Sequence, residues 1–66
     1  MRVFLNGEPR ELDEGATVDA AVAITGAPDR GVAVAVDGEV VPRGQWTSMQ
    51  LQEDQKVEVL QAVQGG

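Results

Sequence analysis

The chain of 66 residues contains no cysteine and no histidine. Without cysteine it forms no disulfide, no thiolate zinc site and no cysteine nucleophile, and this absence agrees with a reducing compartment. Without histidine, the common catalytic triads are excluded as well. None of the four hydroxyl residues lies in the pattern of a nucleophile elbow; they are Thr17, Thr25, Thr47 and Ser48. We therefore predict that the chain is not an enzyme by itself.

Positive charge is also scarce, because five basic residues stand against eleven acidic ones and the net charge is −6. Phosphate binding needs clustered lysine and arginine, so nucleic acid is excluded as a partner. The acidic charge either keeps the domain soluble or steers it toward a basic partner surface. The acidic pairs Asp13-Glu14 and Glu53-Asp54 fall in predicted loops. Solvation explains them better than acid–base chemistry, and we expect no metal site.

Long hydrophobic runs are missing. The opening segment MRVFLNGEPR has an apolar run of three residues, whereas a signal peptide needs about 7 to 15. No stretch approaches the roughly 20 apolar residues of a membrane span. We therefore expect a cytoplasmic protein without a membrane partner. A chain of this length forms one domain, here residues 1–66, with a thin core.

Two hairpins are predicted from turn dipeptides. The segments MRVFL and EPREL flank Asn6-Gly7, and VAVAV and EVV flank Asp37-Gly38. Both dipeptides suit a type I′ turn, in which the two central residues have positive φ. Because Pro9 donates no hydrogen bond to a ladder, EPREL is expected at a sheet edge. A last strand is predicted over 56–63, next to the first strand near the middle of the sheet.

One helix of about two turns is predicted between the hairpins. Thr17 is expected as its N-cap and Gly26 as its C-cap, followed by Pro28. Val18, Ala21 and Val22 recur at helical spacing and predict its buried face. The order of elements predicts an α+β fold, a mixed sheet of four to five strands with one helix packed across it.

Strand alternation predicts an exposed apolar patch. If Val57 and Val59 point inward, Leu60 and Ala62 point outward, and Phe4 points outward from the first strand. Such patches tend to mark interfaces, although a single exposed phenylalanine is also tolerated on ordinary surfaces. Trp46 is expected to cover the open end of the core rather than to bind a partner.

The chain closes with QAVQGG. Glycine loses more backbone freedom on folding than any other residue, so a terminal pair adds nothing to a core. We expect 63–66 to form a flexible tail that reaches about 13 Å when extended, at about 3.3 Å per residue. Glycine also leaves its carbonyl open to attack in a narrow channel. The pattern favours a tail that works inside another protein's active site.

The stretch VAVAVDGEVVPRGQW and the closing VEVLQAVQGG resemble the ThiS family, the small sulfur carriers of thiamin biosynthesis. The resemblance covers nearly the whole chain and implies a ubiquitin-like β-grasp fold. It implies that a ThiF-like adenylyltransferase adenylates the Gly66 carboxylate with ATP and magnesium. Sulfur from a cysteine desulfurase system then yields a thiocarboxylate, which the thiazole synthase ThiG consumes. Gly65 belongs to the activated end, Gln64 and Val63 to the threaded segment, and the chain needs no cofactor of its own.

Two departures from the family pattern are small. Members often have asparagine where Asp37 stands, and Gly-Asp before the last strand, where this chain has Glu53-Asp54-Gln55-Lys56. Three alternatives stay open: a sulfur carrier of another pathway such as molybdopterin synthesis, a protein modifier that joins Gly66 to lysines of its targets, and an interaction module with an inert tail.

Overall fold

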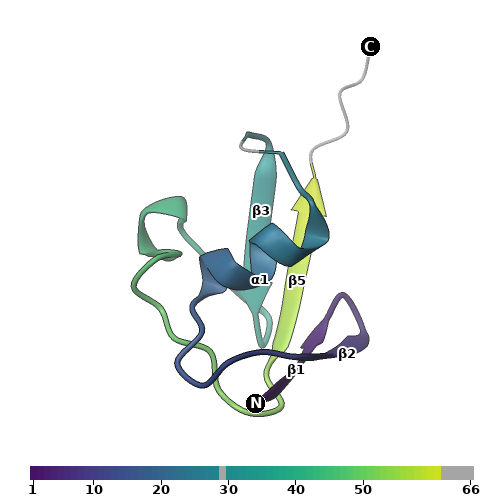
Figure 1. The fold of residues 1–66 in the computed structure, drawn as a ribbon. Coiled ribbons are helices and arrows are strands. Elements are labelled where there is room, and N and C mark those ends of the chain that lie inside the picture. The colour runs from purple at the N-terminus through teal and green to yellow at the C-terminus, as the bar shows by residue number, and fades with distance from the viewer. Residues whose placement is uncertain (29, 62–66) are drawn as a thin grey trace.

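The computed structural model describes residues 1–28 and 30–61; residue 29 and residues 62–66 lie outside that description. Its elements follow the predicted order (Figure 1). They are β1 (Arg2–Leu5), β2 (Glu8–Glu11), α1 (Val18–Thr25), β3 (Val32–Val36), β4 (Glu39–Val41), a short 3₁₀ helix (Arg43–Gln45) and β5 (Lys56–Gln61). The predicted α+β class is confirmed.

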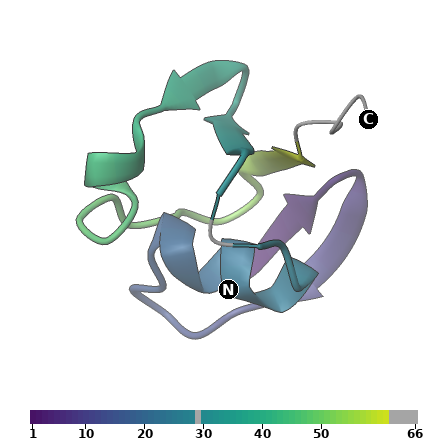
Figure 2. The same ribbon diagram turned by 90° about the horizontal axis from the view of Figure 1, so that it is seen from above.

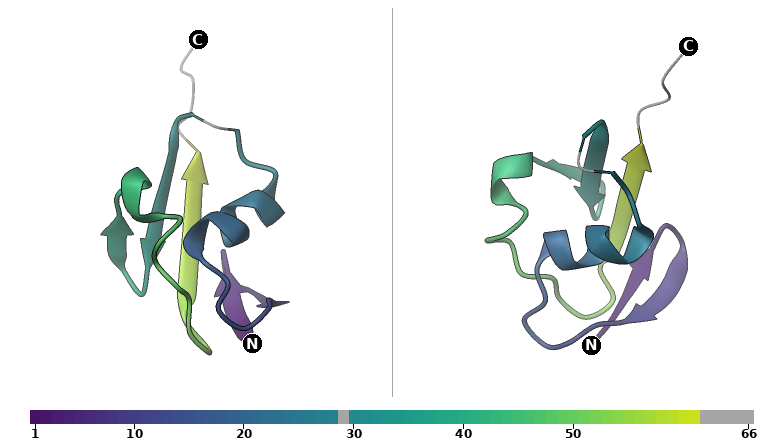
Figure 3. Two further views of the ribbon diagram at one scale, coloured as in Figure 1. Left: turned by 60° about the vertical axis from the view of Figure 1, so that its left-hand side comes forward. Right: turned by 45° about the horizontal axis from the view of Figure 1, so that its top comes forward.

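The five strands form one sheet in the order β2-β1-β5-β3-β4. The last strand, β5, lies in the middle, parallel to β1 and antiparallel to β3. Both views in Figure 3 show β5 between β3 and the β1–β2 hairpin. The predicted pairing of the first and last strands is therefore confirmed, as is the edge position of the strand that contains Pro9.

The helix covers one face of this sheet. It crosses in front of β3 and β5 in Figure 1, and Figure 2 shows the strands to one side of it. The strand residues predicted to point inward are buried with those of the helix. The core comprises Val3, Leu5, Val18, Ala21, Val22, Val34, Val36, Val41, Trp46, Leu51, Val57 and Val59. On the opposite face, the described strand residues Val40 and Leu60 are exposed.

The two ends of the helix are capped by different hydrogen bonds. Gly26 has a φ of 72° and its N–H donates to the Ala23 carbonyl, which confirms the predicted glycine C-cap. Thr17 occupies the predicted N-cap position, but its hydroxyl bonds to the Asp19 carboxylate instead of a helix N–H. The first helix N–H groups donate instead to carbonyls of the long loop before β5, Val18 to Met49 at 3.0 Å and Asp19 to Trp46 at 3.2 Å.

Trp46 closes the end of the core, as predicted. Its side chain is 6% exposed, and its indole N–H donates to the Val41 carbonyl at 3.0 Å. The loop that carries it is tied to the helix side by a bond from the Leu51 N–H to the Ala16 carbonyl. This loop therefore packs as part of the domain although it has little regular structure.

Candidate functional site

The central strand, β5, leads directly to the closing segment that the sequence predicts as the site. Gln61, at the end of β5, is the last described residue before that segment. The predicted site residues Ala62, Val63, Gln64, Gly65 and Gly66 lie outside the described residues. The site that the structure does describe is the surface around the last residues of β5.

On the uncovered face, Phe4 and Leu60 line one depression of about 630 Å³. Leu60 is 63% exposed, whereas Phe4 is half-buried and its ring lies under the Arg2 guanidinium, 5.2 Å from the ring centre. Phe4 is paired with Lys56 in the sheet, so Leu60 lies four residues further along β5. The charged residues Lys56 and Glu58 also line the depression, which makes it a mixed rather than a purely apolar surface.

The apolar surface also extends away from Phe4, across β3 and β4. Leu60 is paired with Ala33, and Ala35 is paired with both Glu58 and Val40. Paired residues share one face of a sheet, and Val40 is 75% exposed. The sequence reasoning missed this side of the surface. The alternation of valine and alanine over Val32–Val36 contained the signal, because the alanines must face away from the buried valines.

Asn6 is a second residue that the sequence reasoning missed, since it was interpreted only as part of a turn. It lines the depression beside Phe4, and its side-chain amide makes two hydrogen bonds with the backbone of Val59. These contacts hold β5 two residues before its described end.

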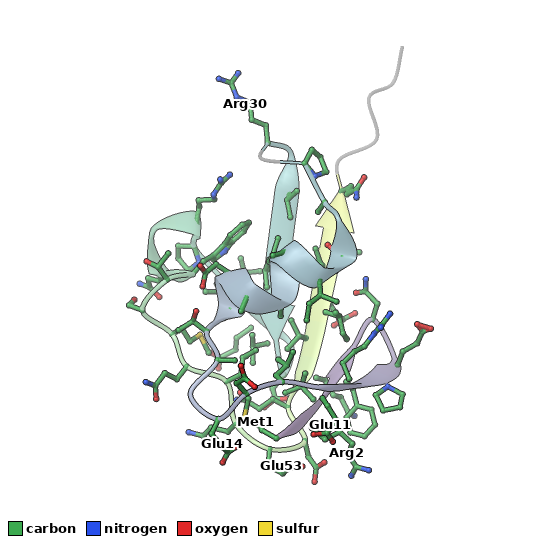
Figure 4. The ribbon with its side chains drawn as sticks, in the orientation of Figure 1. Met1, Arg2, Glu11, Glu14, Arg30 and Glu53 are labelled. Carbon is green, nitrogen blue, oxygen red and sulfur yellow. The ribbon has the colours of Figure 1, made fainter. Side chains whose placement is uncertain are left out.

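Charged contacts gather at the other end of the molecule, where β5 begins. Figure 4 shows Met1, Arg2, Glu11, Glu14 and Glu53 close together there. Arg2 donates to Asp54 at 2.8 Å, and this hydrogen bond raises the pKa of the guanidinium. Partial desolvation lowers the pKa of the Met1 ammonium, but the carboxylates of Glu11, Glu14 and Glu53 together raise it above its usual value. Two of the loop acids therefore form surface ion pairs, Glu14 with the Met1 ammonium and Asp54 with Arg2.

Two further observations concern the residues 1–28 and 30–61. Within them, no group of three or more carboxylates is arranged to hold a metal ion. No helix in this part of the chain has the length and apolar character needed to cross a membrane.

The fold and sequence are similar to proteins of thiamin biosynthesis. A solved structure of the thiamine biosynthesis protein ThiS from Geobacter metallireducens is 28% identical, with a TM-score of 0.78 and full coverage of both chains. Thiazole synthases from Magnetococcus marinus and Paramagnetospirillum magneticum are 36% and 30% identical over all 66 residues. The chain spans a fifth, 20%, of the length of these two relatives.

The family comparison covers almost the whole chain. Residues 3–66 match the ThiS family, including the closing diglycine. The five-stranded mixed sheet with one helix is the β-grasp fold of the solved ThiS structure. The chain belongs to the ThiS family.

Proposed function

We propose that the chain is a sulfur carrier of thiamin biosynthesis and that Gly66 carries the sulfur. The observation that supports this most directly is the match to the ThiS family, which continues through Gly65 and Gly66. The structure adds a central strand, β5, that leads from the middle of the domain toward that segment. In this proposal residues 1–66 form one carrier domain with 63–66 as its tail.

The chemistry requires activation of a carboxylate. The Gly66 carboxylate is a poor electrophile until it attacks the α-phosphate of ATP, which releases pyrophosphate and leaves an acyl adenylate. The outer sulfur of a protein persulfide then displaces AMP and forms an acyl disulfide. A thiol cleaves the S–S bond of this acyl disulfide and is oxidised to a disulfide with the persulfide cysteine, so the product is a thiocarboxylate that differs from the starting chain by one sulfur in place of one oxygen. ATP and magnesium belong to the activating partner, a ThiF-like adenylyltransferase, and a cysteine desulfurase system supplies the sulfur. The chain itself acts as a co-substrate without a cofactor.

Each site residue has a proposed part in this reaction. Gly66 reacts, and Gly65, Gln64 and Val63 thread into the partner's active site, since about 13 Å of extended chain fits a narrow channel. Threading costs about 1–2 kcal/mol of backbone entropy per residue. Docking of the domain offsets that cost, and we assign the docking to Phe4, Leu60 and Ala62.

The thiazole synthase ThiG is the proposed acceptor of the sulfur. Two relatives named thiazole synthase contain a segment similar to this entire chain within a protein five times as long. A carrier fused to a synthase keeps donor and acceptor together at high effective concentration. These relatives therefore support a working partnership between this chain and a thiazole synthase. The cytoplasm, where ATP is available, is the proposed location of this partnership.

Intact mass spectrometry tests the proposal directly. The chain is incubated with the adenylyltransferase, ATP and a sulfur source, and we expect the mass gain of exchanging one oxygen for one sulfur. Deletion of Gly66 is the matched control and should abolish the gain. An unchanged mass with a partner of proven activity would contradict the proposal. Stable conjugates to other proteins would instead support the modifier function.

Charge substitutions test the docking surface. Phe4→Glu and Leu60→Glu should each weaken binding to the adenylyltransferase about tenfold, because each removes apolar area from the interface. Ile24→Glu is the matched control, because Ile24 is 45% exposed but lies on the helix. Calorimetry measures affinity, and circular dichroism checks that the variants stay folded. Equal affinity of all three variants would place docking elsewhere.

A further inference from the structure

The side chain of Asn6 replaces a strand residue beside β5. Its Nδ2 donates to the Val59 carbonyl at 3.3 Å, and the Val59 N–H donates to its Oδ1 at 2.8 Å. An asparagine side chain has the same donor and acceptor as a peptide group. The amide thus satisfies both backbone groups of Val59, as a neighbouring strand would do.

The backbone leaves the sheet at this same residue. β1 pairs with β5 through Phe4 and Leu5, and the Asn6 N–H still donates to the Val57 carbonyl at 2.8 Å. With a φ of 51°, Asn6 then turns the chain into the hairpin. The backbone at this end of β1 makes its last hydrogen bond to β5 at Val57. The Asn6 side chain adds the next hydrogen bonds, at Val59.

Only one strand pairs with β5 beyond this step, within the described part of the chain. β3 pairs with Val59, Leu60 and Gln61 on the other side. On the β1 side of β5, only every second residue points its backbone N–H and C=O away from β3. After Val59, the next residue to do so is Gln61. Asn6 therefore gives the end of β5 its support on that side.

We propose that Asn6 is a positioning residue for the reacting terminus, an inference that rests on the proposed function. Its amide fixes the point from which residues 62–66 depart, so a partner receives the tail at a constant place relative to the docking surface. Without it, Leu60 and Gln61 gain freedom that must be lost again when the tail is threaded. Asn6 also lines the depression between Phe4 and Leu60, which couples tail and docking surface.

The second hairpin offers a matched control. Asp37 has a φ of 50°, and its Oδ1 accepts the Lys56 N–H at 2.9 Å. It thus holds the first residue of β5, at the end remote from the tail. Glycine at either position keeps the positive φ of the turn and removes the side-chain bonds, and the backbone freedom that it adds to the unfolded chain is common to both variants.

The experiment compares Asn6→Gly with Asp37→Gly and the wild-type chain. Amide hydrogen exchange followed by NMR should show about tenfold faster exchange at Val59 in Asn6→Gly, and at Lys56 in Asp37→Gly, as loss of one hydrogen bond predicts. Thiocarboxylate formation with the adenylyltransferase should fall about tenfold in Asn6→Gly alone. Because docking is assigned to Phe4 and Leu60, which are unchanged, we expect the loss in kcat rather than in KM, although Asn6 lines the same depression.

The outcomes separate this inference from the proposed function. Equal rates of thiocarboxylate formation in the two variants would overturn the positioning role and leave the carrier function standing. An unchanged exchange rate at Val59 in Asn6→Gly would also overturn it. Absence of product from the wild-type chain would overturn the carrier function, and the positioning role with it.

Discussion

The two hairpin turns share one backbone shape and differ in one side-chain atom. Asn6 and Asp37 have φ values of 51° and 50°, and the glycine after each has a φ of 85°. Both residues also bond to β5, Asp37 at its first residue and Asn6 further along at Val59. The central strand is thus held by the turns of both hairpins, close to opposite ends.

The choice of asparagine or aspartate follows from which backbone groups of β5 still lack a hydrogen-bond partner at each turn. At Lys56, the Asp37 N–H already donates to the carbonyl at 2.8 Å, so the side chain has only to accept the Lys56 N–H. At Val59, the Asn6 N–H is not available, because it donates to Val57. The side chain must both donate and accept there, which an amide does and a carboxylate does not.

Among the exchanges that keep the turn, Asn6→Asp should lower the stability of the fold most. Aspartate tolerates positive φ, but its carboxylate leaves the Val59 carbonyl without a donor and places a negative charge against it. We expect the free energy of unfolding at pH 7 to fall by about 1–2 kcal/mol. Urea unfolding followed by the fluorescence of Trp46, the only tryptophan and a buried one, measures the change. Wild-type stability in this variant would show that the amide does not donate to Val59.

The turns themselves were predictable because their signal is local. Asn-Gly and Asp-Gly both favour positive φ at two successive residues, whatever lies around them. The inward valines of β1, β3 and β5 were predictable for a similar reason, since alternation along a strand fixes which side chains share a face. Hydrophobicity then decides which face is buried.

The second role of each turn was not predictable, because it depends on distant partners. Asn6 and Val59 are 53 residues apart. The order of elements predicts that β1 and β5 are neighbours, but it does not give the register that sets Asn6 against Val59. The contacts at the helix N-terminus were not predictable for the same reason: Thr17 is the N-cap residue as predicted, but carbonyls of Trp46 and Met49 reach the helix N–H groups across the fold.

The residues of the candidate site likewise fall into those that the sequence predicts and those that depend on distant strand pairing. Residues 63–66 were assigned from the closing motif and the family resemblance and Ala62 from strand alternation, and all of them stay a prediction. The apolar residues of β3 and β4 beside Leu60 were missed, because their place follows from strand pairing across the sheet. Of these, Val40 shows the limit best: its segment EVV is apolar on both sides, and only the pairing with Ala35 tells which valine faces out.

Asp37→Asn should have the smallest effect, and it is the reverse of the first exchange. The amide oxygen accepts the Lys56 N–H as the carboxylate does, and the Asp37 N–H bond to Lys56 is a backbone bond that the exchange does not touch. The contact from Gln55 Nε2 to Oδ2 is exposed and 3.4 Å long, so its loss weakens the fold little. We expect the free energy of unfolding to change by less than about 0.5 kcal/mol. A loss of unfolding free energy as large as that of Asn6→Asp would mean that the charge at the turn decides stability. The need for a side-chain hydrogen-bond donor would then not distinguish the two hairpins.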